Sequence, residues 1–160
     1  MISPTHDIDL ESAAATCAFA HTIGGHVRPG DTILLGGEIG AGKTHFCRCL
    51  IQSLLDPPED VPSPTFTLVQ TYDSPKGEIW HADLYRLSDT SELVELGLSD
   101  AFSEAICLVE WPDRLGSLAP ANALSIEFVT GETTEARTAR ISWSADKWND
   151  LIDRVKLDQT

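Results

Sequence analysis

Hydrophobic positions along the chain change period several times, and each period predicts a type of element. Continuous apolar runs at 32–35 and 105–109 are typical of buried parallel strands. Alternating apolar and polar residues predict further strands over 66–72, 78–84, 123–129 and 136–143. Helical spacing predicts helices over about 10–23, 43–55, 91–96, 98–103 and 146–155. We expect Asp9 to cap the first helix, after a short polar opening segment.

The order of these elements predicts an α/β fold. Parallel-type strands alternate with helices, and the hairpin-like pairs of strands add antiparallel neighbours. We therefore expect a mixed sheet with a parallel core, antiparallel additions and helices on both faces. With 160 residues and no repeat or long linker, residues 1–160 are expected to form a single domain.

A glycine-rich segment joins the first apolar strand to the next helix. It reads Gly37-Glu38-Ile39-Gly40-Ala41-Gly42-Lys43-Thr44 and fits the P-loop pattern G-x-x-x-x-G-K-[ST]. Backbone N–H groups of such a loop bind phosphate oxygens, Lys43 supplies a cation for the β- and γ-phosphates, and the Thr44 hydroxyl can bind Mg²⁺. His45 follows directly and is a further candidate nucleotide-binding residue. The alternative for His45 is a ring that faces solvent. A glycine-rich turn without a ligand is the structural alternative for the whole segment.

Two carboxylates are candidates for the chemistry around a bound nucleotide. Glu110 directly follows the apolar run 105–109, where P-loop proteins keep an acid that holds the metal directly or through water. Asp83 lies in the segment 81–86, in which a strand would put His81, Asp83 and Tyr85 on one face. Asp83 is a candidate to orient or deprotonate the attacking water, or to extend the metal shell. The structural alternatives are an exposed strand-end carboxylate for Glu110 and an ion pair with Arg86 for Asp83.

A proline-containing segment, Ser63-Pro64-Thr65-Phe66-Thr67, follows the P-loop helix. P-loop proteins often keep in this place a switch that senses the γ-phosphate and the metal. A plain loop that leads into a strand is the alternative. Ser63, Pro64 and Thr65 are therefore candidate nucleotide-binding residues.

Charge and cysteine usage restrict the partners and the compartment. The 25 acidic and 11 basic residues give a net charge of −14, which repels polyphosphate and argues against direct high-affinity binding of DNA or tRNA. Any link to nucleic acid is expected to run through a partner. The four cysteines show no C-x-x-C pair, which indicates buried thiols in a reducing compartment. No signal peptide or membrane-length apolar stretch is present, so we expect a cytoplasmic protein without a membrane contact.

Four motifs together resemble one family. Residues 37–44, 63–69, 81–87 and 108–112 resemble, in this order, the TsaE (YjeE) ATPases of bacterial tRNA modification. The resemblance implies a P-loop fold, Mg²⁺-dependent ATP binding with slow hydrolysis, and a role in making threonylcarbamoyladenosine next to the tRNA anticodon. It also implies work with TsaB and TsaD, of which TsaD is the threonylcarbamoyl transferase.

The resemblance also assigns roles to single residues. Lys43 and Thr44 match the phosphate and metal residues, Asp83 and Glu110 match the required acids, and residues 63–65 match the switch-like segment. Trp111 matches a tryptophan beside the acid. His45 stands where family members often have a second threonine, and from about residue 116 the tail matches in pattern only.

We therefore expect an ATP hydrolase that binds and resets the TsaB–TsaD complex, stimulated by these partners. A nucleotide-gated scaffold with incidental hydrolysis is an alternative from another functional class. A small-molecule P-loop kinase clamps the transferred phosphoryl group with arginines on a closing lid. This class is disfavoured because the arginines of this chain are scattered, and the nearest to a pair are Arg137 and Arg140. A GTPase is disfavoured because no Asn-Lys-x-Asp string occurs.

Overall fold

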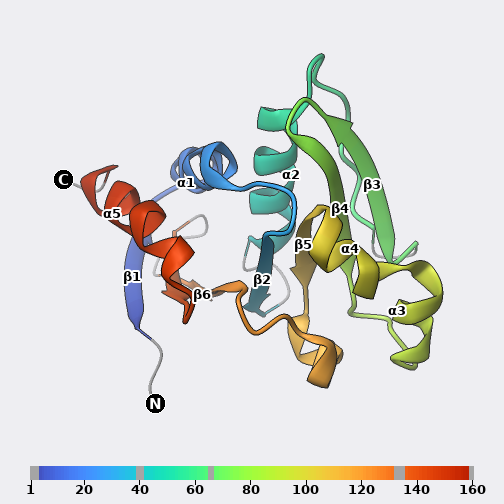
Figure 1. The fold of residues 1–160 in the computed structure, drawn as a ribbon. Coiled ribbons are helices and arrows are strands. Elements are labelled where there is room, and N and C mark those ends of the chain that lie inside the picture. Colours follow the sequence, from blue (N-terminus) through green and yellow to red (C-terminus); the bar gives the residue numbers. More distant parts are fainter. Residues whose placement is uncertain (1–3, 39–41, 65–66, 132–135, 159–160) are drawn as a thin grey trace.

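The computed structural model describes residues 4–38, 42–64, 67–131 and 136–158. Its strands are β1 (Thr5–Leu10), β2 (Thr32–Gly37), β3 (Val69–Ser74), β4 (Gly77–Asp83), β5 (Ile106–Glu110), β6 (Leu124–Thr130) and β7 (Arg137–Ser142). Its α-helices are α1 (Ala13–His26), α2 (Lys43–Leu54), α3 (Ser91–Leu96), α4 (Leu98–Glu104) and α5 (Asn149–Asp158). Two short 3-10 segments, η1 (Pro112–Leu118) and η2 (Asp146–Trp148), complete the described elements (Figure 1).

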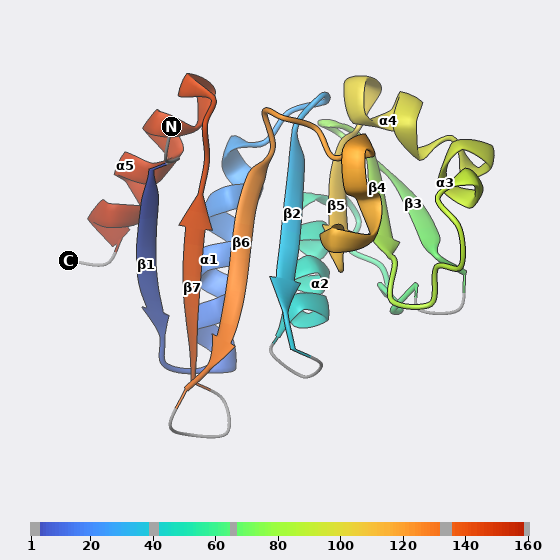
Figure 2. The ribbon, with the colours of Figure 1, turned by 90° about the horizontal axis from the view of Figure 1, so that it is seen from below.

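All described strands belong to one seven-stranded sheet with the order β1-β7-β6-β2-β5-β4-β3 (Figure 2). The four central strands β6, β2, β5 and β4 pair in parallel. The outer pairs β1–β7, β6–β7 and β3–β4 are antiparallel. The predicted α/β class, with a parallel core and antiparallel additions, is confirmed.

Helices cover both faces of the sheet at the two strands β2 and β5. Ile33 and Leu108 point toward α1, α2 and α5 and join the larger apolar core. Leu34 and Val109 point the other way and pack with residues of α3, α4 and η1. In Figure 2, α1 and α2 lie behind the sheet and η1 lies in front of β5. Burial on both faces explains why these strands are continuous apolar runs in the sequence.

One face of the outer strands carries charge instead of a helix. Asp7 on β1 pairs with Arg140 on β7, whose register partner on β6 is Glu127. The opposite face of the same strands is buried, as Ile8 and Ile141 show. This alternation is typical of antiparallel strands with one face open to solvent.

The start of the chain differs from the prediction. Residues 5–10 form β1, and the first helix starts at Ala13 with Ser12 as its cap; the Ser12 hydroxyl accepts a hydrogen bond from the Ala15 amide at 3.1 Å. Asp9 therefore caps no helix. Ile8 and Leu10 are buried while Asp7 and Asp9 are exposed, so the segment has the period of a strand, and β7 supplies its partner.

The other element predictions are confirmed with small shifts in their bounds. Position 66 of the predicted strand 66–72 lies outside the described residues; β3 starts at Val69, directly after Leu68, whose backbone is left-handed with φ of 67°. The last helix starts with the 3-10 segment η2 and extends to Asp158. Within the described ranges, no helix is both long and apolar enough to cross a membrane.

Candidate functional site

The carboxyl ends of the parallel strands position the candidate site. β2 ends at Gly37, and α2 begins at Lys43 directly after Gly42. Gly42 has φ of 107° and Gly37 has φ of 128°, backbone conformations that favour glycine. A Cβ atom on Gly37 would lie 2.5 Å from the carbonyl oxygen of Phe128. Ile39, Gly40 and Ala41 of the predicted loop lie outside the described residues.

Lys43 lies across the start of this loop. Its ammonium donates hydrogen bonds to the carbonyl oxygens of Gly37, at 2.6 Å, and Glu38, at 2.8 Å. It also lies 4.1 Å from the centre of the Trp111 ring, within the range of a cation–π contact. Burial lowers the pKa of Lys43, although the carboxylates of Glu110 and Asp83 act in the opposite direction. The ammonium of Lys43 is thus partly removed from water and has carbonyl oxygens as hydrogen-bond acceptors.

Thr44 and Glu110 are brought together from α2 and β5. The Thr44 hydroxyl donates a hydrogen bond of 2.8 Å to Oε1 of Glu110. The second carboxylate oxygen, Oε2, lies 2.6 Å from Nε2 of His81 on β4. Glu110 and His81 are each only 1% exposed. The exposed-carboxylate alternative for Glu110 is therefore wrong.

Asp83 lies at the same edge of the sheet. It is the register partner of Glu110 across β4 and β5, and it is 5% exposed. Its Oδ1 accepts a hydrogen bond from the Tyr85 amide at 3.1 Å. Because alternate residues of a strand share a face, His81 and Asp83 lie on one face of β4, as the sequence predicted, and this face is turned to α2. Tyr85, the third residue of the predicted face, lies beyond the end of β4. The structure thus places the two predicted acids side by side near Lys43.

Trp111 continues directly from Glu110 with an unusual backbone. Its φ of 59° is left-handed, and its amide donates to the carbonyl oxygen of Leu35 at 3.2 Å. This turn brings the indole against Lys43 and against the ring of Tyr85, whose centre is 5.1 Å away. Such a conformation costs a non-glycine residue about 1–2 kcal/mol and persists only where the surrounding structure holds it.

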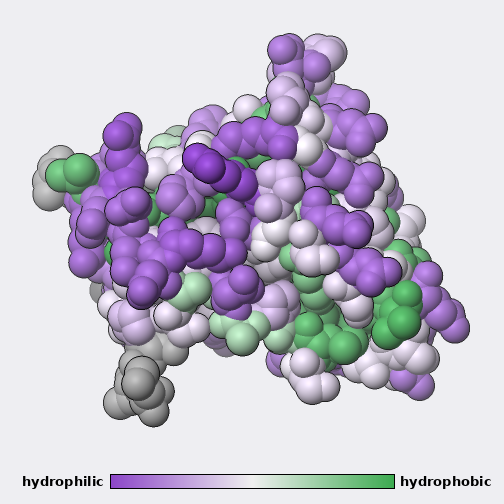
Figure 3. Space-filling model, viewed as in Figure 1, coloured by the Kyte–Doolittle hydropathy of each residue, from purple (hydrophilic) through white to green (hydrophobic). Residues whose placement is uncertain are grey.

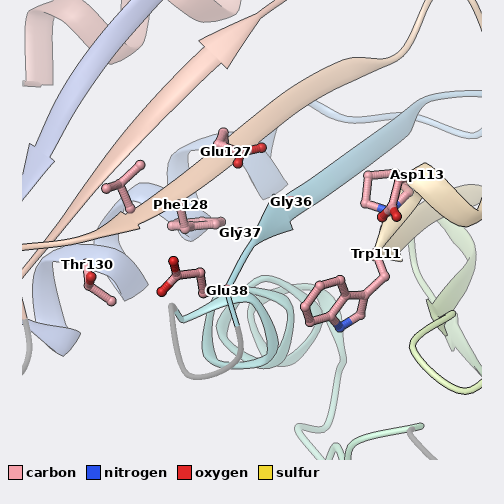
Figure 4. Close-up of a pocket in the computed structure, with 10 residues that line it drawn as sticks. Gly36, Gly37, Glu38, Trp111, Asp113, Glu127, Phe128 and Thr130 are labelled. Atoms are coloured by element: carbon pink, nitrogen blue, oxygen red, sulfur yellow. The ribbon is translucent and has the colours of Figure 1, made fainter.

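A cavity of about 820 Å³ adjoins the start of the loop (Figure 4). Gly36, Gly37 and Glu38 line it at the end of β2, with Trp111 on one side and Thr130 on the other. Glu127 and Asp113 add further carboxylates. The cavity therefore opens at the carboxyl edge of the sheet, where ligands of open α/β sheets bind.

The other predicted nucleotide-binding residues are His45 and the segment 63–65. His45 is half-buried, and its Nε2 lies 3.0 Å from the carbonyl oxygen of Ala13 on α1, so the ring is neither solvent-facing nor turned to the loop. The segment before Ser63 is tied to α2, because Arg48 donates to the Val61 carbonyl oxygen at 3.0 Å. Pro64 is buried, and Thr65 lies outside the described residues.

The residues of this site fit a magnesium ion better than a softer metal. The Thr44 hydroxyl and a Glu110 oxygen are hard oxygen donors, which Mg²⁺ prefers. Cys47 and His81 also have donor atoms within 4.8 Å of Glu110. Burial, with the Glu110 and Asp83 carboxylates, raises the pKa of the Cys47 thiol well above its usual value. A thiol that stays protonated is a poor metal ligand.

Sequence reasoning did not assign a role to His81 or Cys47. His81 was grouped with Asp83 by its place on the strand, but its partner Glu110 lies 29 residues away in the sequence. Cys47 was counted as a buried thiol, which the structure confirms. The alternating positions 81 and 83 were the available signal that His81 faces the site.

A buried strand, a glycine-containing loop and a helix that begins with Lys43 and Thr44 define a P-loop α/β protein. The chain matches the family "Threonylcarbamoyl adenosine biosynthesis protein TsaE" over residues 10–139. The chain belongs to the TsaE family, as the four motifs indicated.

Relatives agree with this assignment, and a solved structure has the same fold. TsaE of Rickettsia bellii is 38% identical over 117 residues, 73% of this chain and 81% of that protein. TsaE of Bacillus subtilis is 37% identical over 112 residues, 69% of each chain. The crystal structure of Bacillus subtilis YdiB covers 100% of this chain and 99% of its own, with a TM-score of 0.80 at 22% identity, and so shows the same fold.

Proposed function

We propose that this protein is a Mg²⁺-dependent ATPase that supports threonylcarbamoyladenosine modification of tRNA by binding and resetting the TsaB–TsaD complex. One observation carries the proposal. Thr44, at the start of the P-loop helix, contacts Glu110 at 2.8 Å, and Asp83 lies opposite Glu110 on the next strand. Membership of a family named for threonylcarbamoyl adenosine biosynthesis supports the tRNA-modification role.

Phosphate binding is assigned to Lys43 and the start of α2. Lys43 as a whole is only 5% exposed, so water weakens the attraction of its side chain to an anion less than it would at the open surface. Its hydrogen bonds to the carbonyl oxygens of Gly37 and Glu38 hold it at the loop, where phosphate oxygens can exchange for these acceptors. The free N–H groups of the helix start add further donors for the anion.

Metal binding is assigned to Thr44 and Glu110, because their oxygens meet at one point. A Mg²⁺ ion held by these residues would supply positive charge that offsets the charge of the β- and γ-phosphates. Glu110 would hold the ion directly or through a water. The carboxylate is already oriented on both of its oxygens, by Thr44 and by His81.

Hydrolysis is assigned to Asp83 and a water molecule. The water oxygen forms a bond to the γ-phosphorus, and the bond from that phosphorus to the bridging oxygen of ADP breaks. Asp83 orients the water through its carboxylate and accepts its proton as the bond forms. The Tyr85 amide holds Oδ1 of Asp83 at 3.1 Å, which fixes the direction of the carboxylate.

The partner role explains how an acidic protein serves a tRNA enzyme. With a net charge of −14, the chain repels tRNA and reaches it only through TsaB and TsaD. ATP would order the segment 63–65 and dock the chain on these partners in the cytoplasm. Hydrolysis would then release it.

Phosphate release from Mg-ATP tests this proposal directly. The purified chain is measured alone and then with TsaB and TsaD added. We expect slow release alone and marked stimulation by the pair. Bound ATP without stimulation would favour the nucleotide-gated scaffold, and phosphate transferred to a metabolite would favour a kinase.

A further inference from the structure

His81 on β4 contacts Glu110, the acid of the site, at the oxygen that Thr44 does not contact. Its Nε2 lies 2.6 Å from Oε2 of Glu110, and both residues are 1% exposed. The other oxygen of Glu110 accepts the Thr44 hydroxyl at 2.8 Å. The carboxylate is thus held at both oxygens, one by a candidate metal ligand and one by a histidine. In the described hydrogen bonds, this histidine contacts neither the P-loop nor the residues that line the cavity in Figure 4.

The direction of the hydrogen bond follows from the chemistry of the two groups. An ionised carboxylate only accepts, so the imidazole nitrogen Nε2 must carry the proton. Among the described residues, Nδ1 of His81 is a buried atom without a hydrogen-bond partner. At this buried position, an Nδ1 atom that lacks a proton and a partner costs less than an N–H group without an acceptor. The missing partner therefore fits the form of the ring in which Nε2 carries the proton.

We propose that His81 is a positioning residue whose Nε2–H holds the Glu110 carboxylate toward Thr44 and so sets how strongly Mg²⁺ strengthens nucleotide binding. The inference rests on the proposed function, because it concerns the same metal site. Without this donor, Oε2 of Glu110 is buried and unpaired, and the carboxylate is free to turn away from Thr44. Partners that orient a metal ligand typically change metal affinity about 10- to 100-fold when they are removed.

Calorimetric titration with ADP, in EDTA and in excess Mg²⁺, measures this coupling as a ratio of two dissociation constants. The variants are His81→Phe, which keeps a planar ring without a donor, and His81→Gln, whose amide can restore the donor. His21→Phe, on the exposed side of α1, is the matched control. We expect the Mg²⁺ enhancement to fall about 10-fold or more in His81→Phe and to return largely in His81→Gln. The control should keep the wild-type ratio.

The outcomes separate this inference from the proposed function. Wild-type enhancement in a folded His81→Phe variant overturns the positioning role. A wild-type chain that binds no ADP in either buffer overturns the nucleotide site itself. If His81→Phe does not fold, the ¹⁵N spectrum of the wild-type imidazole decides: a proton on Nε2 supports the proposal, and a proton on Nδ1 of the neutral ring removes the donor on which it depends.

Discussion

Asp83 and Glu110 lie directly opposite each other at the ends of the parallel strands β4 and β5. Both side chains face α2, where Lys43 and Thr44 begin the helix. The pairing brings two carboxylates and an ammonium to the same edge of the sheet. Glu110 makes a contact at each carboxylate oxygen, with Thr44 and with His81, and Asp83 accepts a hydrogen bond from the Tyr85 amide. The contact with the Thr44 hydroxyl supports the proposed role of Glu110 toward the metal, and Asp83 is the second acid, proposed to act on the water.

Removal of either acid should abolish partner-stimulated turnover. For Asp83→Ala we expect a loss of about 10²–10⁴-fold, the usual contribution of a general base. Glu110→Ala should lose turnover together with the Mg²⁺ enhancement of ADP binding, because it removes a metal ligand. Phosphate release with TsaB and TsaD measures both. Asp150→Asn, exposed on α5, is the control. Unchanged turnover in both alanine variants would overturn these assignments.

Lys43→Met should weaken ATP binding about 10- to 100-fold, because it removes a charged hydrogen-bond donor worth about 1.5–3 kcal/mol. Equilibrium binding of ATP measures the change. Retained affinity in a folded Lys43→Met variant would show that the ammonium does not contact the phosphates.

The lowered pKa of Lys43 predicts a pH dependence of ATP binding. Burial lowers this pKa from its ordinary 10.5, so the ammonium loses its proton at a lower pH than an exposed lysine does. ATP affinity should be full below the lowered pKa and should fall as the pH rises through it. Affinity titrated over alkaline pH checks this, and Lys43→Met should flatten the curve. An identical slope in both proteins would assign the dependence to another group.

The cysteines should differ in their reaction with iodoacetamide. Burial raises the pKa of Cys107 and of Cys49 to about 12, and that of Cys47 well above its usual value. These thiols stay protonated and covered at mildly alkaline pH, whereas Cys17 is partly exposed. Mass spectrometry of the native protein should therefore find label mainly on Cys17. Denatured protein, as the control, should be labelled at all four positions. Rapid native labelling of Cys47 would show that the site opens.

Two glycine substitutions should move the stability in opposite directions. Gly37→Ala forces a side chain into a φ of 128° and toward the Phe128 carbonyl oxygen, so we expect a loss of at least about 1–2 kcal/mol. Gly25→Ala on α1 meets no atom within 4 Å and should stabilise the helix by up to about 1 kcal/mol. Denaturant unfolding measures both. A stable Gly37→Ala variant would contradict the described end of β2.

Local patterns were enough to predict on which elements several candidate site residues lie. The end of β2 at Gly37 and the start of α2 at Lys43 follow from patterns among neighbouring residues. The apolar run of β5 predicted that Glu110 stands at the end of a buried strand, and its burial confirmed this. Alternation on β4 predicted that His81 and Asp83 share a face.

The sequence by itself determined the α/β class, the P-loop and the residues that lie at strand ends, because these depend on contacts within a few positions. Only the tertiary structure decided that residues 5–10 are a strand, since their partner β7 lies far along the chain. It also decided that Glu110 meets Thr44, 66 residues away, and His81, 29 residues away. These contacts depend on strand order and register, and a shift of one residue would turn each side chain to the opposite face.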